Sequence, residues 1–141
     1  MSKEQRQVDI NEIQHLHFKL LRYVRYNLLD GERVVNDLLE WRDLWYSVLP
    51  TRFPYPSIKP DDGPYHPYTE LSMLRNVRGE MWPVDTLYIW TNDKALLQLQ
   101  QRIQERWEPS EVVVITPDKD REMRFANLND EHDRVLFVWW D

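Results

Sequence analysis

One stretch of the sequence, residues 86–116, constrains the fold more than any other, because strand, helix and strand signals follow one another there. Residues 86–91 and 111–116 are short runs rich in branched and aromatic side chains, which is typical of strands. Between them, apolar residues recur at helical spacing, at Leu96, Leu99, Ile103 and Trp107. Two strands joined by a helix within one sheet are expected to run parallel, with a right-handed crossover. This stretch therefore predicts a sheet with one crossover helix.

Residues 9–49 predict a helical hairpin. A capping-box pattern opens a first helix that is expected to reach about residue 29. Asp30 and Gly31 supply the turn, and a second helix is expected over residues 32–49. The apolar residues of this second helix repeat alternately at four and three positions, at Val34, Leu38, Trp41, Trp45 and Val48. Such a seam packs against another helix, so two antiparallel helices are expected.

Residues 50–68 form the most unusual segment of the chain. They hold six of the nine prolines and a set of ring-bearing side chains, Phe53, Tyr55, Tyr65, His66 and Tyr68. Proline removes a backbone donor and favours extended geometry, so neither a helix nor a central strand is expected here. Because disordered segments are poor in aromatic rings, we interpret this segment as an ordered strap that lies across the domain.

The remainder of the chain completes the predicted fold. A short helix is expected over residues 69–78, and two further strands over residues 121–126 and 134–140. Residues 86–141 then form a β-α-β-β-β unit. The predicted class is α+β, with α/β as the alternative. It combines the helical hairpin, the Pro/aromatic strap and a mixed four-stranded sheet with one crossover helix. A chain of 141 residues is expected to form a single domain.

Composition narrows the possible classes of protein. The chain contains seven tryptophans but no cysteine, which excludes disulfides, thiolate metal sites and a cysteine nucleophile. No run of about 18 apolar residues is present, so a membrane span is not expected. The net charge of −6 argues against a nucleic-acid partner, which normally needs a basic face, and is compatible with a basic protein partner. We expect a cytoplasmic protein without a cofactor.

Three short motifs have the composition of metal sites but not the pattern. His15 and His17 fall within a helical repeat, where residues two apart point about 200° apart, so they are not expected to share a metal. Residues 61–63 and 118–120 each contain two aspartates, but neither run continues into the glycine and distal glutamate of a calcium-binding loop. Aspartate is common in turns for local hydrogen-bonding reasons. No metal site is therefore predicted.

Two surfaces are candidates for binding a protein partner. The strap offers rigid, amphipathic rings of the kind enriched at protein interfaces, and the turn over residues 129–133 offers carboxylates. The predicted contact residues are Tyr55, Tyr65, His66, Tyr68, Asp130, Glu131 and Asp133. The acidic surface is expected to continue over the second predicted helix, through Asp37, Glu40 and Asp43.

The strand ends offer an alternative, small-ligand site. Asn92, Asp93 and Asp118 are expected just after the carboxyl ends of two parallel strands, where ligands gather in open α/β sheets. Asn92 is also a good cap for the helix that follows. With His66 or His132 as the acid–base group, these residues would form the site of a small enzyme or ligand-binding domain.

The leading hypothesis from the sequence is a non-enzymatic, acidic protein-binding module. An inhibitor, such as an immunity or antitoxin-like factor that covers a basic active site, is the specific form considered. The alternative is a small enzyme or ligand-binding domain with a His/Asp site at the strand ends. A homodimer is a third hypothesis, held through a face with Trp41 and Trp45 or through the final strand, if that strand is a sheet edge.

Overall fold

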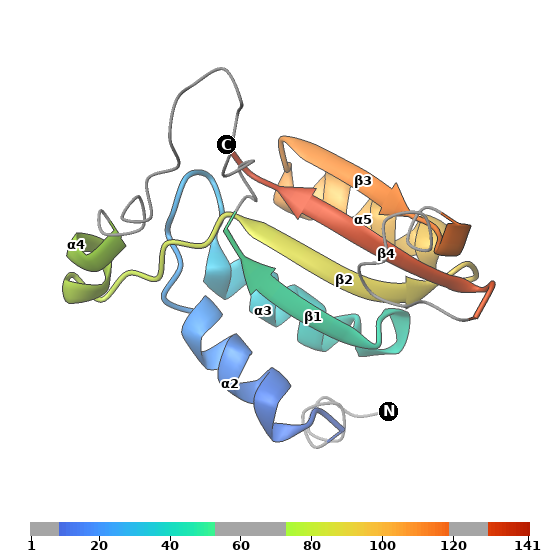
Figure 1. The fold of residues 1–141 in the computed structure, drawn as a ribbon, viewed down its shortest axis with the longest axis horizontal. Coiled ribbons are helices and arrows are strands. Elements are labelled where there is room, and N and C mark those ends of the chain that lie inside the picture. The colour runs from blue at the N-terminus through green and yellow to red at the C-terminus, as the bar shows by residue number, and fades with distance from the viewer. Residues whose placement is uncertain (1–8, 53–72, 119–129) are drawn as a thin grey trace, which may run out of the picture.

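A computed structural model describes residues 9–52, 73–118 and 130–141 of the chain. These residues form α-helices, one short 3-10 helix and a single four-stranded sheet (Figure 1). In chain order the elements are α2 Glu12–Leu21, α3 Gly31–Glu40, η1 Arg42–Leu44, β1 Ser47–Thr51, α4 Met73–Arg78, β2 Thr86–Asn92, α5 Leu96–Trp107, β3 Glu111–Ile115 and β4 Asp133–Trp139. Among the described residues, no helix combines the length and apolar character needed to cross a bilayer.

The sheet confirms the α+β class and the four-stranded sheet, and it adds a strand order that the sequence did not provide. The order is β1-β2-β4-β3, and every neighbouring pair is antiparallel. The two strands joined by the crossover helix α5, β2 and β3, run in the same direction, but β4 lies between them. The expected parallel pair is therefore not a pair of neighbours, and the prediction of a mixed sheet was wrong, because every neighbouring pair of strands is antiparallel. The nearly continuous apolar character of β4 follows from its central place, since a central strand is covered more completely.

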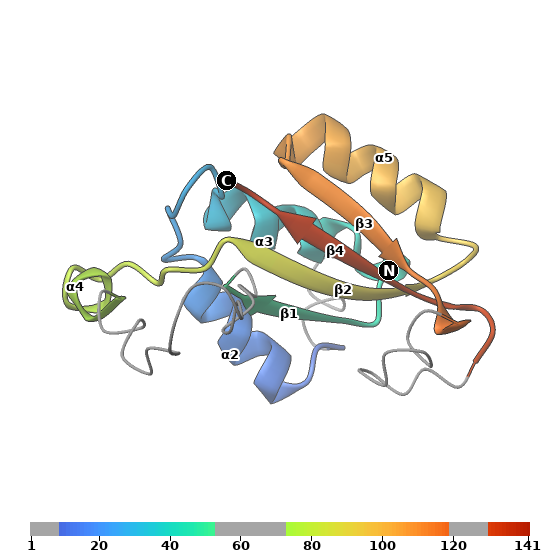
Figure 2. The ribbon, with the colours of Figure 1, turned by 45° about the horizontal axis from the view of Figure 1, so that its top comes forward.

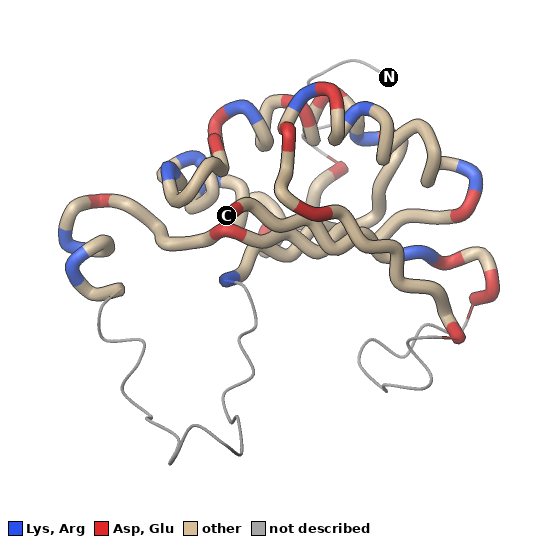
Figure 3. Tube along the Cα trace, turned by 90° about the horizontal axis from the view of Figure 1, so that it is seen from above, with Lys and Arg blue, Asp and Glu red and all other residues tan. Residues whose placement is uncertain are grey.

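All of the long helices lie on one face of the sheet, as Figures 2 and 3 show. Leu87 and Ile89 of β2 pair with Val138 and Leu136 of β4, and all four side chains are fully buried. Because side chains alternate along a strand, these residues share the helix-covered face, while Tyr88 and its neighbours point to the other face. The predicted apolar face of α5 is confirmed, since Leu99, Ile103 and Trp107 are its buried residues.

The α2–α3 hairpin is confirmed, with a close helix–helix approach at the start of α3. Asp30 caps α3 by accepting a hydrogen bond from the backbone N–H of Arg33 at 3.2 Å. Gly31 is buried directly after the cap, and its backbone N–H donates to the carbonyl of Val24. A Cβ at Gly31 would come within 1.8 Å of the carbonyl oxygen of Leu21. Only glycine fits this contact without a shift of the α2 backbone.

The predicted bounds of both hairpin helices were wrong. The first helix ends at Leu21 instead of residue 29, because residues 22–30 form turns, with Asn27 in the left-handed region at φ 54°. The second helix ends at Glu40, and residues 47–51, of which the first three were assigned to it, form strand β1. Pro50 is compatible with this strand, since proline is tolerated on an edge strand.

A buried glutamine of α2 completes the hydrogen bonding along β1, which is an edge strand. The side-chain amide of Gln14 donates to the carbonyl of Val48 at 2.8 Å, and its side-chain carbonyl accepts from the N–H of Val48 at 2.7 Å. Gln14 thus pairs with the strand as a neighbouring backbone would. It blocks part of an edge that would otherwise be open to another chain.

Both surfaces considered for a homodimer were wrong. Trp41 and Trp45 are buried within the chain, where Trp41 stacks on Trp107 with ring centroids 5.2 Å apart. The indole N–H of Trp45 donates to the carbonyl of Leu38 at 2.8 Å. The final strand β4 is central in the sheet and offers no edge. These tryptophans are core residues of the monomer.

Parts of the sequence-based interpretation lie outside the described residues. They include the strap from residue 53 onward, the start of the short helix near residue 69, the aspartates of residues 61–63 and the strand predicted over residues 121–126. The described part of that short helix is α4. The predicted β-α-β-β-β unit drew all four strands of the sheet from residues 86–141. In the structure one strand of the sheet, β1, comes from before this unit.

Candidate functional site: the acidic end of the sheet

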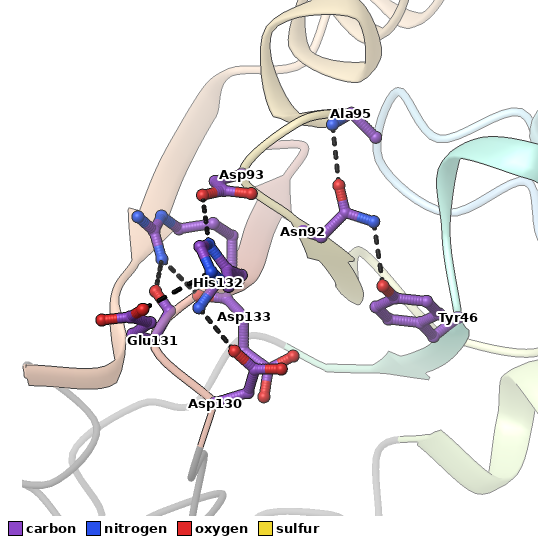
Figure 4. Close-up of polar contacts among 9 residues, drawn as sticks. Tyr46, Asn92, Asp93, Ala95, Asp130, Glu131, His132 and Asp133 are labelled. Atoms are coloured by element: carbon purple, nitrogen blue, oxygen red, sulfur yellow. Dashed lines mark hydrogen bonds and ion pairs between the residues drawn. The ribbon is translucent and has the colours of Figure 1, made fainter.

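Two polar segments that are far apart in the sequence meet at one end of the sheet. The end of β2 and the start of β4 are antiparallel neighbours, with Asn92 opposite Asp133. The backbone N–H of Asp93 donates to the carbonyl of His132 at 2.9 Å. Two predicted sets, the acidic partner-binding residues and two members of the alternative ligand site, therefore share one place. We call the surface formed by Asp93, Asp130, Glu131, His132 and Asp133 the acidic end (Figure 4).

The turn that precedes β4 is built by its own polar residues. The side chain of Asp130 accepts a hydrogen bond from the backbone N–H of His132 at 2.9 Å, and its carbonyl accepts from the N–H of Asp133 at 3.0 Å. Arg134 donates to the carbonyls of Glu131 and Asp133, at 2.8 and 2.7 Å. Asp130 and Arg134 thus hold the turn, which leaves the Glu131 carboxylate 87% exposed.

An ion pair joins the two segments. Nδ1 of His132 lies 2.8 Å from a carboxylate oxygen of Asp93. This hydrogen bond, followed by the negative charge of Asp93, raises the pKa of His132 above its usual 6.5, and Glu131 and Asp130 add to the effect. The same hydrogen bond lowers the pKa of Asp93 below its usual 3.8. The arrangement therefore favours a charged imidazolium beside a charged carboxylate.

Two exposed aromatic rings border the acidic end, and sequence analysis did not identify either. Tyr46 and Trp90 are 50% and 40% exposed and pack edge to face, with centroids 5.4 Å apart. The indole N–H of Trp90 donates to the Asp133 carboxylate at 3.0 Å, and the side-chain amide of Asn92 donates to the Tyr46 hydroxyl at 2.9 Å. Both rings are thus held in place by polar neighbours at the acidic end. Figure 4 shows the contact between Asn92 and Tyr46.

A sequence signal for Trp90 did exist. Leu87 and Ile89 alternate with Tyr88 and Trp90, and strand periodicity places the second pair on the face away from the helices. Tyr46 had no such signal, because the residues around it had been assigned to a helix.

Asn92 contacts both Tyr46 and the turn before α5, although it is not the N-cap residue that the sequence predicted. Helix α5 begins at Leu96 after Ala95, three residues later than expected. The side-chain oxygen of Asn92 instead accepts from the backbone N–H of Ala95 at 2.9 Å, which fixes the turn between β2 and α5. Asp118 follows β3, the strand on the far side of β4 from β2, and is exposed there. It is thus separated from Asn92 by the width of β4.

The expected continuation of the acidic surface over the second predicted helix was wrong for Asp37. Its carboxylate is buried and accepts hydrogen bonds from Arg106 at 3.1 and 3.2 Å and from the indole of Trp107 at 2.9 Å. Asp37 joins α3 to α5 and is structural. The four predicted strap residues, Tyr55, Tyr65, His66 and Tyr68, lie outside the described residues.

The part of the chain that the structure describes contains no group of three His, Asp or Glu side chains placed to hold a metal ion. Two cavities, of about 360 and 230 Å³, are lined by residues outside the acidic end. The acidic end is a cluster of four carboxylates with two exposed rings beside it. Among the described residues, its neighbours in the sequence include two permanent cations, Lys94 and Arg134.

Comparison with known proteins gives no relative from which to infer a function. No family model matches the chain, and no match was found among curated proteins or among solved structures. The function is therefore argued from the chain's own geometry.

Proposed function

We propose that this protein is a non-enzymatic protein-binding module whose acidic end contacts a basic surface of a partner protein. The observation that carries the proposal is the joint placement of the carboxylates with Tyr46 and Trp90, two half-exposed rings that hydrogen bonds hold in position. Aromatic side chains that are already fixed before binding lose little conformational entropy when a partner covers them. The proposal keeps a cytoplasmic location, as expected from the sequence.

The charge at the acidic end would act mainly on the rate at which the two proteins associate. Exposed carboxylates attract a basic partner over about 10 Å at moderate salt and raise the association rate. Glu131 is suited to attracting a partner, since its carboxylate is almost fully exposed and, among the described residues, forms an ion pair only with His132, at 3.5 Å. The contact would then be held by burial of the Tyr46 and Trp90 rings.

The form of this function that we favour is inhibition of a partner by covering its basic site. Exposed carboxylates with two rings beside them are complementary in charge to a cationic site, such as the active site of a nuclease. In that respect the protein would act as immunity proteins and antitoxins do. This form rests on complementarity of charge and on analogy.

A second candidate function has one specific observation in its favour. His132 and Asp93 form a paired histidine and carboxylate, which is the arrangement that the enzyme hypothesis requires for acid–base chemistry. In this reading His132 would exchange a proton with a small substrate, and Asp93 would orient the imidazole and stabilise its charge. The exposure of the Glu131 carboxylate and of the Tyr46 and Trp90 rings favours the binding module over this alternative.

Native mass spectrometry of the protein, purified gently from its own source, tests the proposal. We expect a co-purifying basic polypeptide at fixed stoichiometry, and we expect Glu131→Lys and Trp90→Ala to lose it. Glu105→Lys is the matched control, because it makes the same charge change at an exposed position of α5 and should retain the partner.

Two outcomes would contradict the binding module. One is a Glu131→Lys variant that keeps the partner at the same stoichiometry. The other is a small added mass that His132→Ala loses and Glu131→Lys keeps, which would instead support the enzyme or ligand-binding alternative.

A further inference from the structure

The outer face of α2 carries an unexpected row of apolar side chains. Ile13, Leu16, Leu20 and Tyr23, the last just beyond the helix, are 70%, 50%, 47% and 57% exposed. Their spacing of three, four and three places them on one side of the helix, while Phe18 and Leu21 on the other side belong to the core. A helix that is apolar on two sides is normally covered on both.

This row leads into a groove that α4 and the segment after it complete. Leu20 and Tyr23 line a cavity of about 360 Å³ together with Val77, Met81, Trp82 and Glu80. Val77 itself is 59% exposed. Contiguous apolar surface that remains exposed on a folded chain marks a site of interaction. We call this surface, from Ile13 to Trp82, the α2–α4 groove.

Exposed cations adjoin residues of the groove in the sequence, although the protein as a whole carries a net charge of −6. Lys19 precedes Leu20, and Arg78 follows Val77. Arg75 is also exposed, but it is two residues from Val77 on α4 and points about 200° away from it. Within the described residues, none of these three cations is paired with a carboxylate. Glu80 is the one carboxylate in the lining of the cavity.

The groove and the acidic end lie at opposite ends of the molecule. In Figure 3 the basic positions of α4 are at one end of the trace, and the acidic turn before β4 is at the other end. The two surfaces have opposite charge and share no residue, so they are suited to different occupants.

We propose that the α2–α4 groove is the docking site for an acidic, amphipathic helix of a partner protein. The row from Ile13 to Tyr23 covers eleven residues, a rise of about 15 Å, which matches about three turns of a helix lying along it. Apolar side chains of the partner at helical spacing would fill the groove, as in other helix-in-groove complexes. Its acidic side chains would meet Lys19 and Arg78 beside the groove.

The concave shape favours a helix over a membrane surface. A lipid bilayer contacts a flat or convex face, whereas this cavity can accept individual side chains. The charge pattern favours an acidic helix over a second copy of α2, since Lys19 lies beside the row and would repeat in the copy.

The test uses a fluorescein-labelled designed peptide of about 16 residues, with leucine at helical spacing and glutamate at the remaining positions. A second peptide carries lysine in place of every glutamate. Fluorescence anisotropy with the full chain should show micromolar binding of the glutamate peptide, and at least tenfold weaker binding of the lysine peptide.

Matched variants locate the binding. We expect at least a tenfold loss of affinity for the glutamate peptide with Leu20→Glu, and with the double charge reversal Lys19→Glu and Arg78→Glu. The controls are Leu97→Glu on α5, an apolar residue that is 79% exposed, and Lys94→Glu at the acidic end. Both controls should stay within twofold of wild type. All of these positions are exposed, and circular dichroism verifies that each variant folds.

Several results would overturn the proposal. Equal affinity for both peptides would mean that the groove is merely apolar, and unchanged binding by Leu20→Glu would place the site elsewhere. Sedimentation with phosphatidylserine vesicles that Leu20→Glu abolishes, without peptide binding, would identify a membrane surface. A dimer that dissociates in Leu20→Glu, again without peptide binding, would identify a second copy as the occupant.

Discussion

Two regions of the molecule use the same kind of contact, an indole N–H that donates to an aspartate. One is the contact between α3 and α5, which is buried, and the other is the acidic end, which is exposed. At the first, the indole of Trp107 donates to Asp37 at 2.9 Å, and Arg106 completes an ion pair. At the second, the indole of Trp90 donates to Asp133 at 3.0 Å, with the His132–Asp93 pair beside it. The hydrogen bonds are nearly identical in length, but Trp107 is 6% exposed and Trp90 is 40% exposed.

This difference shows that the surroundings, more than the pair itself, decide what such a contact does. In the interior, the indole N–H has no water to bond with, so Asp37 is needed to satisfy it. At the surface, water can replace either partner, so the contact contributes little to stability and mainly fixes the orientation of a ring. The first contact holds the fold, and the second presents side chains to a partner.

The largest predicted difference in stability is between alanine substitutions of the two tryptophans. Trp107→Ala should lower the free energy of unfolding by about 3–5 kcal/mol, since it opens a cavity beneath Trp41 and Trp140. Trp90→Ala should cost only about 1 kcal/mol. Urea denaturation measures both. Equal losses would show that the two sites do not differ in the way that their burial indicates.

A smaller difference is expected between the two carboxylates. Asp37→Ala should cost about 1–3 kcal/mol, because it leaves the buried indole N–H of Trp107 without an acceptor. Asp37→Asn, which retains an acceptor oxygen, should recover part of that loss. Asp133→Ala should stay within about 0.5 kcal/mol of wild type, since Trp90 can donate to water. If Asp37→Ala proved as mild as Asp133→Ala, Asp37 would not hold α3 to α5.

The His132–Asp93 pair predicts a pH window of extra stability. The pKa of His132 is raised by the fold, so its stabilising effect is complete below pH 6.5 and is lost as the pH rises through the raised value. The pKa of Asp93 is lowered, so its effect is present above pH 3.8 and is lost as the pH falls through the lowered value. The pair should therefore stabilise the fold most between about pH 4 and 6.5.

Melting temperatures of wild type and His132→Gln across this range check the prediction. The wild type should melt higher within the window, and the difference should shrink above it. A constant difference from pH 4 to 9 would contradict the role assigned to the pair.

The smallest effect on stability is expected at the most exposed carboxylate. Glu131→Lys should change the free energy of unfolding by less than about 0.5 kcal/mol, because its side chain is 87% exposed. The same variant should abolish binding of the basic partner. This separation of stability from binding is what distinguishes the acidic end from the α3–α5 contact. A strongly destabilised Glu131→Lys would remove that distinction.

Apolar patterns predicted the elements correctly where a segment fitted only a helix or only a strand. The spacing of Leu99, Ile103 and Trp107 identified α5 and its buried face, and the apolar runs identified β2, β3 and β4. The prediction went wrong where two patterns overlapped. Val48 continued the helical repeat of Val34, Leu38, Trp41 and Trp45, but the chain turns after Glu40 and Val48 pairs with Ile89 in the sheet. Contact with β2 and with Gln14 outweighed local helix propensity.

The candidate site was predicted in pieces, and only the enzyme alternative brought some of them together, by placing His66 or His132 with Asp93 or Asp118. Carboxylates in a turn and polar residues after a strand were both noted, but as separate surfaces. They come together because β4 inserts between β2 and β3 and runs antiparallel to both, which brings Asp133 opposite Asn92. Strand order depends on contacts between distant segments, so no local spacing encodes it. For the same reason Tyr46 was missed, since its neighbour Trp90 is 44 residues away in the sequence.

By itself, the sequence determined the α+β class, the crossover helix and the net acidic charge, because these depend on composition and on spacing along the chain. Only the tertiary structure decided which polar groups are interior and which are surface. Asp37 and Asp93 look alike in the sequence, yet one lies between α3 and α5 and the other at the end of a strand. Burial is a property of how distant segments pack together, and it decides whether a carboxylate holds the fold or faces a partner.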